Sequence, residues 1–119
     1  MVGAAAPATY VPDRGDVVWL DFTPQAGREQ AGRRPALVLS PASYNRKSSL
    51  MLCCPVTNQV KGYPFEVSVS GPMTTGVTGV VLADHIRSLD WKARNATKFG
   101  FADPQVTLDV AAKVKLLLP

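Results

Sequence analysis

The spacing of apolar residues limits the possible folds of this chain more than any other feature. Residues 15–22 alternate as in a strand that covers a core with one face. Residues 35–40 form an almost continuously apolar run, which is typical of a central strand. Further strands are predicted at 49–57, 65–70, 80–83 and 86–91, and Pro55 within 49–57 indicates a bulge or a position without a ladder partner.

The C-terminal residues carry the clearest helical pattern. Asp103 can cap a helix there, and Pro104 falls where the first helical turn tolerates proline. Apolar side chains then recur at near-helical spacing and are expected to pack on the strands, at Val106, Val110, Val114 and Leu117. Many short strands with one terminal helix predict a mainly β fold, a small, strongly bent SH3-like barrel decorated by helix. Residues 41–48 are predicted to be a polar connection, and 92–101 are assigned to no element.

The length, composition and charge of the chain indicate how many domains it has, whether it is folded and what kind of partner it favours. The 119 residues suit one domain, predicted to span residues 10–119 after a loose tail at 1–9. An apolar content of 46% with 18% charged residues is that of a folded domain. Thirteen Lys and Arg against nine Asp and Glu give a net charge of +4, which favours an anionic partner such as nucleic acid or an acidic protein.

The cysteines and the hydropathy argue against a disulfide-bonded, zinc-binding, secreted or membrane-spanning protein. Cys53 and Cys54 are adjacent in a predicted strand, so their side chains point to opposite faces and are not a plausible disulfide pair. With one histidine and two cysteines there is no zinc spacing, and no metal is expected. The chain has no convincing signal peptide and no apolar run long enough to span a membrane, so a cytoplasmic protein is expected.

One polar segment is the strongest candidate for a ligand site. It passes directly into an apolar strand and reads Gly27-Arg28-Glu29-Gln30-Ala31-Gly32-Arg33-Arg34-Pro35. The strand would fix Arg34 while the loop leaves it open to a ligand, and the planar, charged fork of arginine suits a phosphate. Composition alone still favours a solvated connection, because most charged, glycine-containing loops are no more than that.

A more specific signal comes from three segments taken in order, residues 13–22, 27–40 and 55–64. In order and spacing they closely resemble the MazF/PemK family of toxin endoribonucleases, close to its MazF branch, from about Tyr10 to the C-terminus. The resemblance implies the small barrel of the CcdB and PemK proteins. Two departures bear on the RNA sequence that would be preferred: Asn58 stands where close relatives can carry a second threonine, and the turn at 71–79 is longer than in those relatives.

The resemblance implies the toxin of a bacterial type II toxin–antitoxin pair. Such a toxin cleaves single-stranded mRNA at specific sequences without a metal or cofactor and so inhibits translation and growth. The 2′-hydroxyl attacks the phosphorus and leaves a 2′,3′-cyclic phosphate and a 5′-hydroxyl. The family works as a homodimer and is blocked by an acidic MazE-like antitoxin. The alternatives are a non-catalytic poison on the same fold that binds DNA gyrase and an RNA-binding barrel without turnover, because fold does not decide function.

The same resemblance assigns three catalytic residues. Arg34 would stabilise charge on the phosphate oxygens, although a guanidinium holds its protons too tightly to be an efficient acid. Thr57 would donate to the phosphate or orient the attacked group. Glu29 would act as the general base or pair with Arg34.

RNA contacts are expected from residues of two kinds. The polar ones are Gln59, Lys61, Arg87 and Arg94, and the aromatic ones, which can stack on splayed bases, are Trp19, Phe22 and Tyr44. Core or dimer packing is an equally open interpretation of Trp19 and Phe22 and is the more common use of such residues. His85 lies outside the family motif and is interpreted as structural or exposed.

Overall fold

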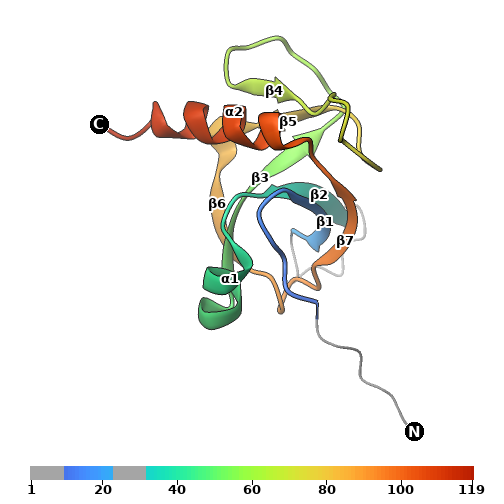
Figure 1. Ribbon diagram of the computed structural model, residues 1–119, viewed down its shortest axis with the longest axis vertical. Coiled ribbons are helices and arrows are strands. Elements are labelled where there is room, and N and C mark those ends of the chain that lie inside the picture. Colours follow the sequence, from blue (N-terminus) through green and yellow to red (C-terminus); the bar gives the residue numbers. More distant parts are fainter. Residues whose placement is uncertain (1–9, 23–31) are drawn as a thin grey trace, which may run out of the picture.

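In the computed structural model, which describes residues 10–22 and 32–119, strands dominate the chain (Figure 1). The strands are β1 (Asp16–Asp21), β2 (Arg33–Val38), β3 (Leu50–Thr57), β4 (Glu66–Ser68), β5 (Val80–Leu82), β6 (Arg87–Asp90) and β7 (Thr97–Phe101). The helices are α1 (Ala42–Ser48) and α2 (Pro104–Lys115), and a single 3₁₀ turn covers Ala83–His85. The expected mainly β fold with a C-terminal helix is confirmed.

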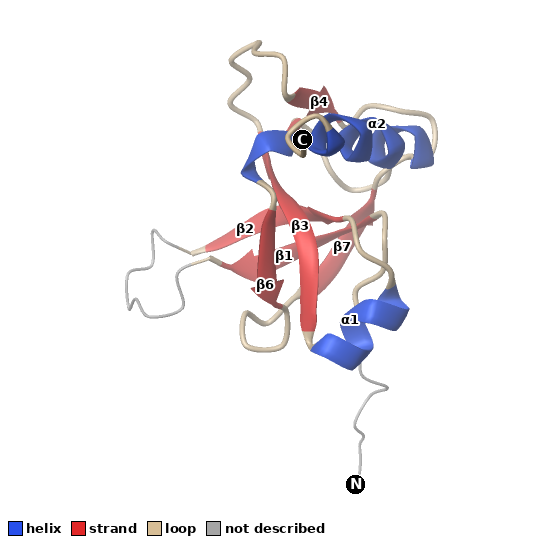
Figure 2. Cartoon of the chain, turned by 90° about the vertical axis from the view of Figure 1, so that its left-hand side faces the viewer, coloured by secondary structure: helices blue, strands red, loops and turns tan. Residues whose placement is uncertain are grey.

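All strand pairs are antiparallel and belong to one sheet with the order β4-β5-β3-β2-β1-β7, and β6 also pairs with β3. Among the described strands β4 and β7 end this path and are not paired with each other, so the sheet bends but does not close into a barrel. Helix α2 lies across one end, beside β4 and β5, and α1 lies at the opposite end (Figures 1 and 2). Neither helix is long and apolar enough to cross a membrane.

Strand β3 changes partners along its length. Its first half, Leu50 to Cys53, pairs with β6, whereas Val56 and Thr57 pair with β5. Pro55 lies between these two stretches and has a register partner only in β2, at Ala36. A residue without an N–H donor is tolerated here, because that edge of β3 has no ladder partner at this position. The expectation for Pro55 is confirmed.

The bent sheet buries side chains on both faces. One cluster includes Val17, Leu37 and Cys54 and is covered by α2, and the other includes Val18 and Cys53. Neighbouring residues of the same strand therefore enter different cores, which explains why 35–40 is almost continuously apolar. Cys53 and Cys54 are buried on opposite faces as free thiols, as predicted, and burial raises the pKa of each to about 12.

Helix α2 begins as predicted. The Asp103 carboxylate accepts a hydrogen bond from the Gln105 N–H at 2.9 Å, and Pro104 occupies the first turn. Val106 and Val110 are buried and Val114 packs against the same cluster. The prediction was wrong for Leu117, which follows the end of α2 and is 44% exposed.

Two elements differ from the sequence-based expectation. Residues 41–48, predicted to be a connection, contain α1, and residues within 92–101, assigned to no element, form β7 on the edge of β1. The apolar signal in each is weak: it is confined to Phe99 and Phe101 in β7, and α1 has no apolar stripe. Helix α1 depends on Asn45, whose side chain is fully buried, and β7 depends on its pairing with Val17 and Val18.

Asn45 connects α1 to three other segments. Its Nδ2 donates to the carbonyl oxygens of Pro12 at 2.8 Å and Ser40 at 3.0 Å, and its Oδ1 accepts from Ser40 Oγ at 2.6 Å. Its backbone oxygen accepts from the Trp91 indole N–H at 2.9 Å. We expect Asn45→Ala to lower the free energy of unfolding by about 2–4 kcal/mol, because it leaves buried polar groups without partners. Urea unfolding measures this change.

The matched control for this prediction is Lys47→Ala, an exposed position of the same helix. It should change the free energy of unfolding by less than about 0.5 kcal/mol. Equal effects of the two substitutions would show that helix propensity, not the buried amide network, sets the stability of α1.

Candidate functional site

A cavity of about 640 Å³ opens where β2 and β3 separate. It is lined from three directions: by the ends of β1 and β2, by the end of β3 with the segment that follows it, and by residues 82–87. Seven of the residues predicted for the site line it: Trp19, Phe22, Arg34, Thr57, Gln59, Lys61 and Arg87. Segments far apart in the sequence therefore supply one site.

The register of β2 with β3 places Arg34 and Thr57 on one face of the sheet. The last paired residues are Ala36 and Pro55, preceded by Leu37 with Cys54. Arg34 lies two residues before Ala36 in β2 and Thr57 lies two residues after Pro55 in β3, so both side chains leave the sheet on the same face as that pair. Both line the cavity. Arg34 lies within β2 and not in the preceding loop as expected, because the strand begins at Arg33.

The chain segment that follows β3 forms one wall of the cavity, and hydrogen bonds within this segment order it. The Glu66 carboxylate accepts the backbone N–H groups of Lys61 at 2.9 Å and Gly62 at 2.8 Å. The Thr57 hydroxyl oxygen accepts the Gln59 N–H at 3.1 Å, which leaves its own proton available for a ligand. Gly62 has a φ of +83°, a conformation that side chains disfavour. The Lys61 and Gln59 side chains are thus attached to an ordered wall.

Two aromatic residues form the opposite wall. The Trp19 ring stacks on Phe99 with 4.5 Å between centroids and remains 37% exposed. The Arg87 guanidinium lies 5.6 Å from the centroid of Phe22. Trp19 and Phe22 therefore present ring surface to the cavity while each is held by a neighbour.

Three further lining residues were missed or set aside on sequence alone: Tyr63, Glu66 and His85. The Tyr63 hydroxyl donates to Asp84 Oδ1 at 3.0 Å, and partial burial with this hydrogen bond raises the pKa of Tyr63. His85 Nε2 is 3.9 Å from the same oxygen and is more than half exposed. The signal for His85 in the sequence is that it is the one histidine of the chain, a natural acid–base group.

The other predicted site residues lie elsewhere. Arg94 does not line the cavity, and its Nη1 donates to the carbonyl oxygens of Asp21 at 3.1 Å and Phe22 at 2.7 Å. Tyr44 is exposed on α1, at the opposite end of the sheet from α2. Glu29 lies outside the described residues. The structure thus brings the two described catalytic candidates together and leaves Arg94 and Tyr44 apart from them.

The arrangement suits a ligand that carries phosphate and flat rings. Arg34, Lys61 and Arg87 supply cations from three segments, and within residues 10–22 and 32–119 no carboxylate forms an ion pair with them. Aromatic faces beside cations are typical of single-stranded nucleic acid sites. In the same residues no three His, Cys, Asp or Glu side chains are grouped as metal ligands would be.

Comparison with known proteins gives consistent matches over nearly the whole chain. Residues 13–118 match the model of the PemK-like, MazF-like toxins of type II toxin–antitoxin systems. The chain is 51% identical over 109 residues to the endoribonuclease toxin MazF of Escherichia coli strain K12, covering 92% of this chain and 96% of that protein.

Solved structures agree with this result. The crystal structure of MazF from Deinococcus radiodurans is 58% identical, with a TM-score of 0.80 over 92% of this chain and 98% of that one. A MazE–MazF crystal structure from the same organism is 53% identical, with a TM-score of 0.80 over 92% of this chain and 97% of that one. The fold described above is therefore that of MazF.

The Glu66 carboxylate gives a prediction about the order of the cavity wall. We expect Glu66→Gln to speed amide hydrogen exchange at Lys61 and Gly62 by about tenfold, because charge-assisted hydrogen bonds become neutral ones. The control is Asp109→Asn, which removes a carboxylate from the exposed face of α2. Unchanged exchange at Lys61 and Gly62 would contradict a role of Glu66 in ordering this wall.

Proposed function

Because the chain belongs to the PemK-like, MazF-like toxins of type II toxin–antitoxin systems, we propose that it is a sequence-specific endoribonuclease that cleaves single-stranded mRNA without a metal. One observation carries the proposal: Arg34 and Thr57 line the same cavity, which is also lined by further cations and by aromatic side chains. That cavity has the chemistry of an RNA chain, which alternates phosphates with flat bases.

The proposed reaction is an internal transfer at one phosphate. The 2′-oxygen loses its proton and bonds to phosphorus, the bond to the 5′-oxygen breaks, and that oxygen takes up a proton. The products are a 2′,3′-cyclic phosphate and a 5′-hydroxyl. Glu29 is the proposed acceptor of the first proton, and the donor of the second is not assigned.

Arg34 and Thr57 act on the charge that develops at phosphorus. The Arg34 guanidinium donates to the non-bridging oxygens, where negative charge grows in the transition state. The Thr57 hydroxyl, whose oxygen already accepts the Gln59 N–H, directs its proton to the same phosphate. Neither residue needs to change its protonation state.

The remaining lining residues hold the RNA on both sides of the scissile phosphate. Lys61 and Arg87 contact phosphates or base edges, Gln59 reads base edges, and Trp19 and Phe22 stack on bases. The presence of cations and rings in one cavity favours a splayed single strand over a duplex.

The assembly is proposed from the family. The toxin acts as a homodimer in the cytoplasm, where its mRNA substrate is found. An acidic MazE-like antitoxin blocks the basic surface, for which the net charge of +4 is suited. In the Deinococcus radiodurans crystal structures MazF occurs with MazE.

Cleavage of a single-stranded RNA in excess EDTA tests the proposal. We expect wild type to cut it and Arg34→Ala to lower kcat by about 10²–10³-fold, through the loss of one donor to the transition state. An oligonucleotide with a 2′-deoxy group at the cut site should not be cut, because the attacking oxygen is missing. Arg46→Ala, which removes an equal charge from exposed α1, should cut at the wild-type rate.

The decisive negative outcome is a folded wild type that cuts no RNA of varied sequence. The endoribonuclease proposal would then fail, and binding to DNA gyrase would be measured next. If Arg46→Ala lost activity as strongly as Arg34→Ala, net charge and not the cavity would be responsible.

A further inference from the structure

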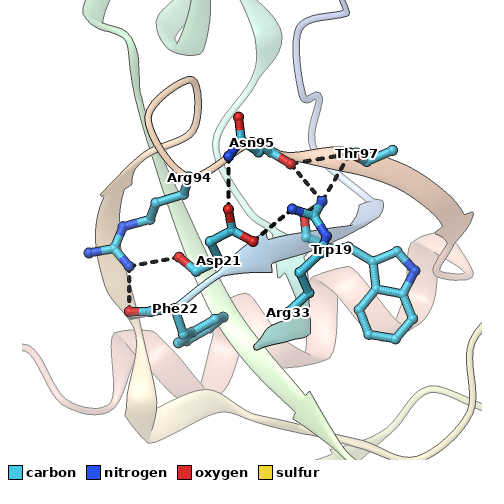
Figure 3. Close-up of polar contacts among 7 residues, drawn as sticks. All are labelled: Trp19, Asp21, Phe22, Arg33, Arg94, Asn95 and Thr97. Carbon is cyan, nitrogen blue, oxygen red and sulfur yellow. Dashed lines mark hydrogen bonds and ion pairs between the residues drawn. The ribbon is translucent and has the colours of Figure 1, made fainter. Parts of the chain in front are cut away.

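Arg33, the neighbour of Arg34, makes more polar contacts than any other described arginine. Its Nη1 donates to Asp21 Oδ1 at 2.8 Å, and its Nη2 lies within 3.2 Å of the Trp19 carbonyl, the Asn95 carbonyl and Thr97 Oγ1 (Figure 3). These acceptors belong to β1, to the segment before β7 and to β7. One guanidinium thus joins three parts of the chain to the start of β2.

Asp21 completes this network. Its second oxygen, Oδ2, accepts Asn95 Nδ2 at 2.8 Å, so the carboxylate is bonded from two sides. The hydrogen bond from Asn95 and the guanidinium of Arg33 hold the pKa of Asp21 below its usual value. Asp21 and Arg33 therefore remain an ion pair at neutral pH, even though their side chains are 29% and 37% exposed.

The network is adjacent in the chain to residues of the candidate site, because Phe22 and Arg34, which line the cavity, directly follow Asp21 and Arg33. Asp21 and Arg33 are the last paired residues of β1 and β2, and Arg94 holds the Asp21 and Phe22 carbonyls beside them (Figure 3). Because side chains alternate along a strand, Arg33 and Arg34 leave β2 on opposite faces. Fixing the backbone at Arg33 therefore fixes the direction in which Arg34 leaves it.

We propose that Arg33 is a positioning residue of the ribonuclease site: its contacts with Asp21, Asn95 and Thr97 lock the end of the β1–β2 pair and so aim Arg34 into the cavity. The inference rests on the proposed function. Arg33 does not touch the RNA. It also holds the Trp19 carbonyl and thereby the strand that presents the Trp19 ring.

Charge and geometry distinguish this role from a direct RNA contact. The Arg33 charge is already paired with Asp21, and its Nη1 and Nη2 both donate within the protein. A lysine keeps the charge but not the planar fork that reaches several acceptors at once. Catalysis is sensitive to such changes, since a displacement of about 1 Å in a catalytic group can cost about 10²-fold in rate.

Arg33→Lys is the first variant to measure, with Arg33→Gln as the second. We expect each to lower kcat for RNA cleavage by about 10–100-fold while KM changes by less than about threefold, because the aim of Arg34 is disturbed but the RNA contacts remain. Circular dichroism melting shows whether each variant is folded. Arg46→Ala, on exposed α1, is the control and should keep the wild-type kcat.

The salt dependence of oligonucleotide binding distinguishes a residue that positions Arg34 from a residue that contacts a phosphate. The probe is the oligonucleotide with a 2′-deoxy group at the cut site. Arg33→Gln should leave the slope of log K against log salt unchanged, whereas Lys61→Gln should reduce it by about 0.7, the value for one phosphate contact on a single strand. A slope reduced by Arg33→Gln, with KM raised and kcat kept, would overturn the proposal.

Failure of the proposed function would be seen separately, as a wild type that cuts no RNA. Amide exchange at Arg33 and Arg34 then decides the structural part of the inference, since Arg33→Lys should speed it by about tenfold if the fork orders this end of β2. If wild type is inactive, unchanged amide exchange in Arg33→Lys would overturn the structural part of the inference. If wild type is active, unchanged exchange together with an unchanged kcat would overturn the whole inference.

Discussion

The antiparallel pairing of β2 with β1 on one edge and with β3 on the other determines the rest of the structure. Its register sets Arg33 opposite Asp21 and places Arg34 on the same face of the sheet as Thr57. A shift of one residue would exchange the faces of Arg33 and Arg34 and would also move Leu37 and Val38 into each other's cores. The apolar residues that follow Pro35 therefore fix the register of the charged residues before it. One strand pairing therefore determines both the packing of the cores and the face on which Arg34 lies.

The cavity exists because β3 does not follow β2 to its end. Beyond Pro55 the strand pairs with β5 instead of β6, and its pairing with β2 ends at Ala36 and Pro55. The opening is bounded by residues whose own backbone groups are already bonded, such as Lys61 and Gly62 on the Glu66 carboxylate. The cations that line it are therefore presented from ordered backbone, which lowers the entropy cost of binding a flexible RNA chain.

The sequence could predict what depends on local pattern. Apolar runs located β1, β2 and β3, the Asp103 cap located α2, and the ordered motifs located Arg34 and Thr57. Helix α1 and β7 were missed because they depend on partners distant in the sequence, the carbonyls bound by Asn45 and the edge of β1. Glu66 and His85 could not be placed for the same reason, because only the folded chain brings the segment after β3 next to the 3₁₀ turn. Arg94 was assigned by motif alone, and its bonds to backbone carbonyls required coordinates.

Adjacent arginines show how a strand separates two uses of the same side chain. In the sequence Arg33 and Arg34 form one charged run, and nothing in their composition distinguishes them. In the structure alternation places Arg33 against a carboxylate and three oxygen acceptors, and Arg34 in a cavity beside Thr57. A guanidinium whose charge is paired and whose Nη1 and Nη2 donate within the protein can order backbone, whereas one that faces a cavity can respond to charge that develops there. The two roles are linked, because Arg34 is fixed by the ordered backbone at Arg33. If Arg34 were mobile, fixing it on the ligand would cost part of the binding free energy.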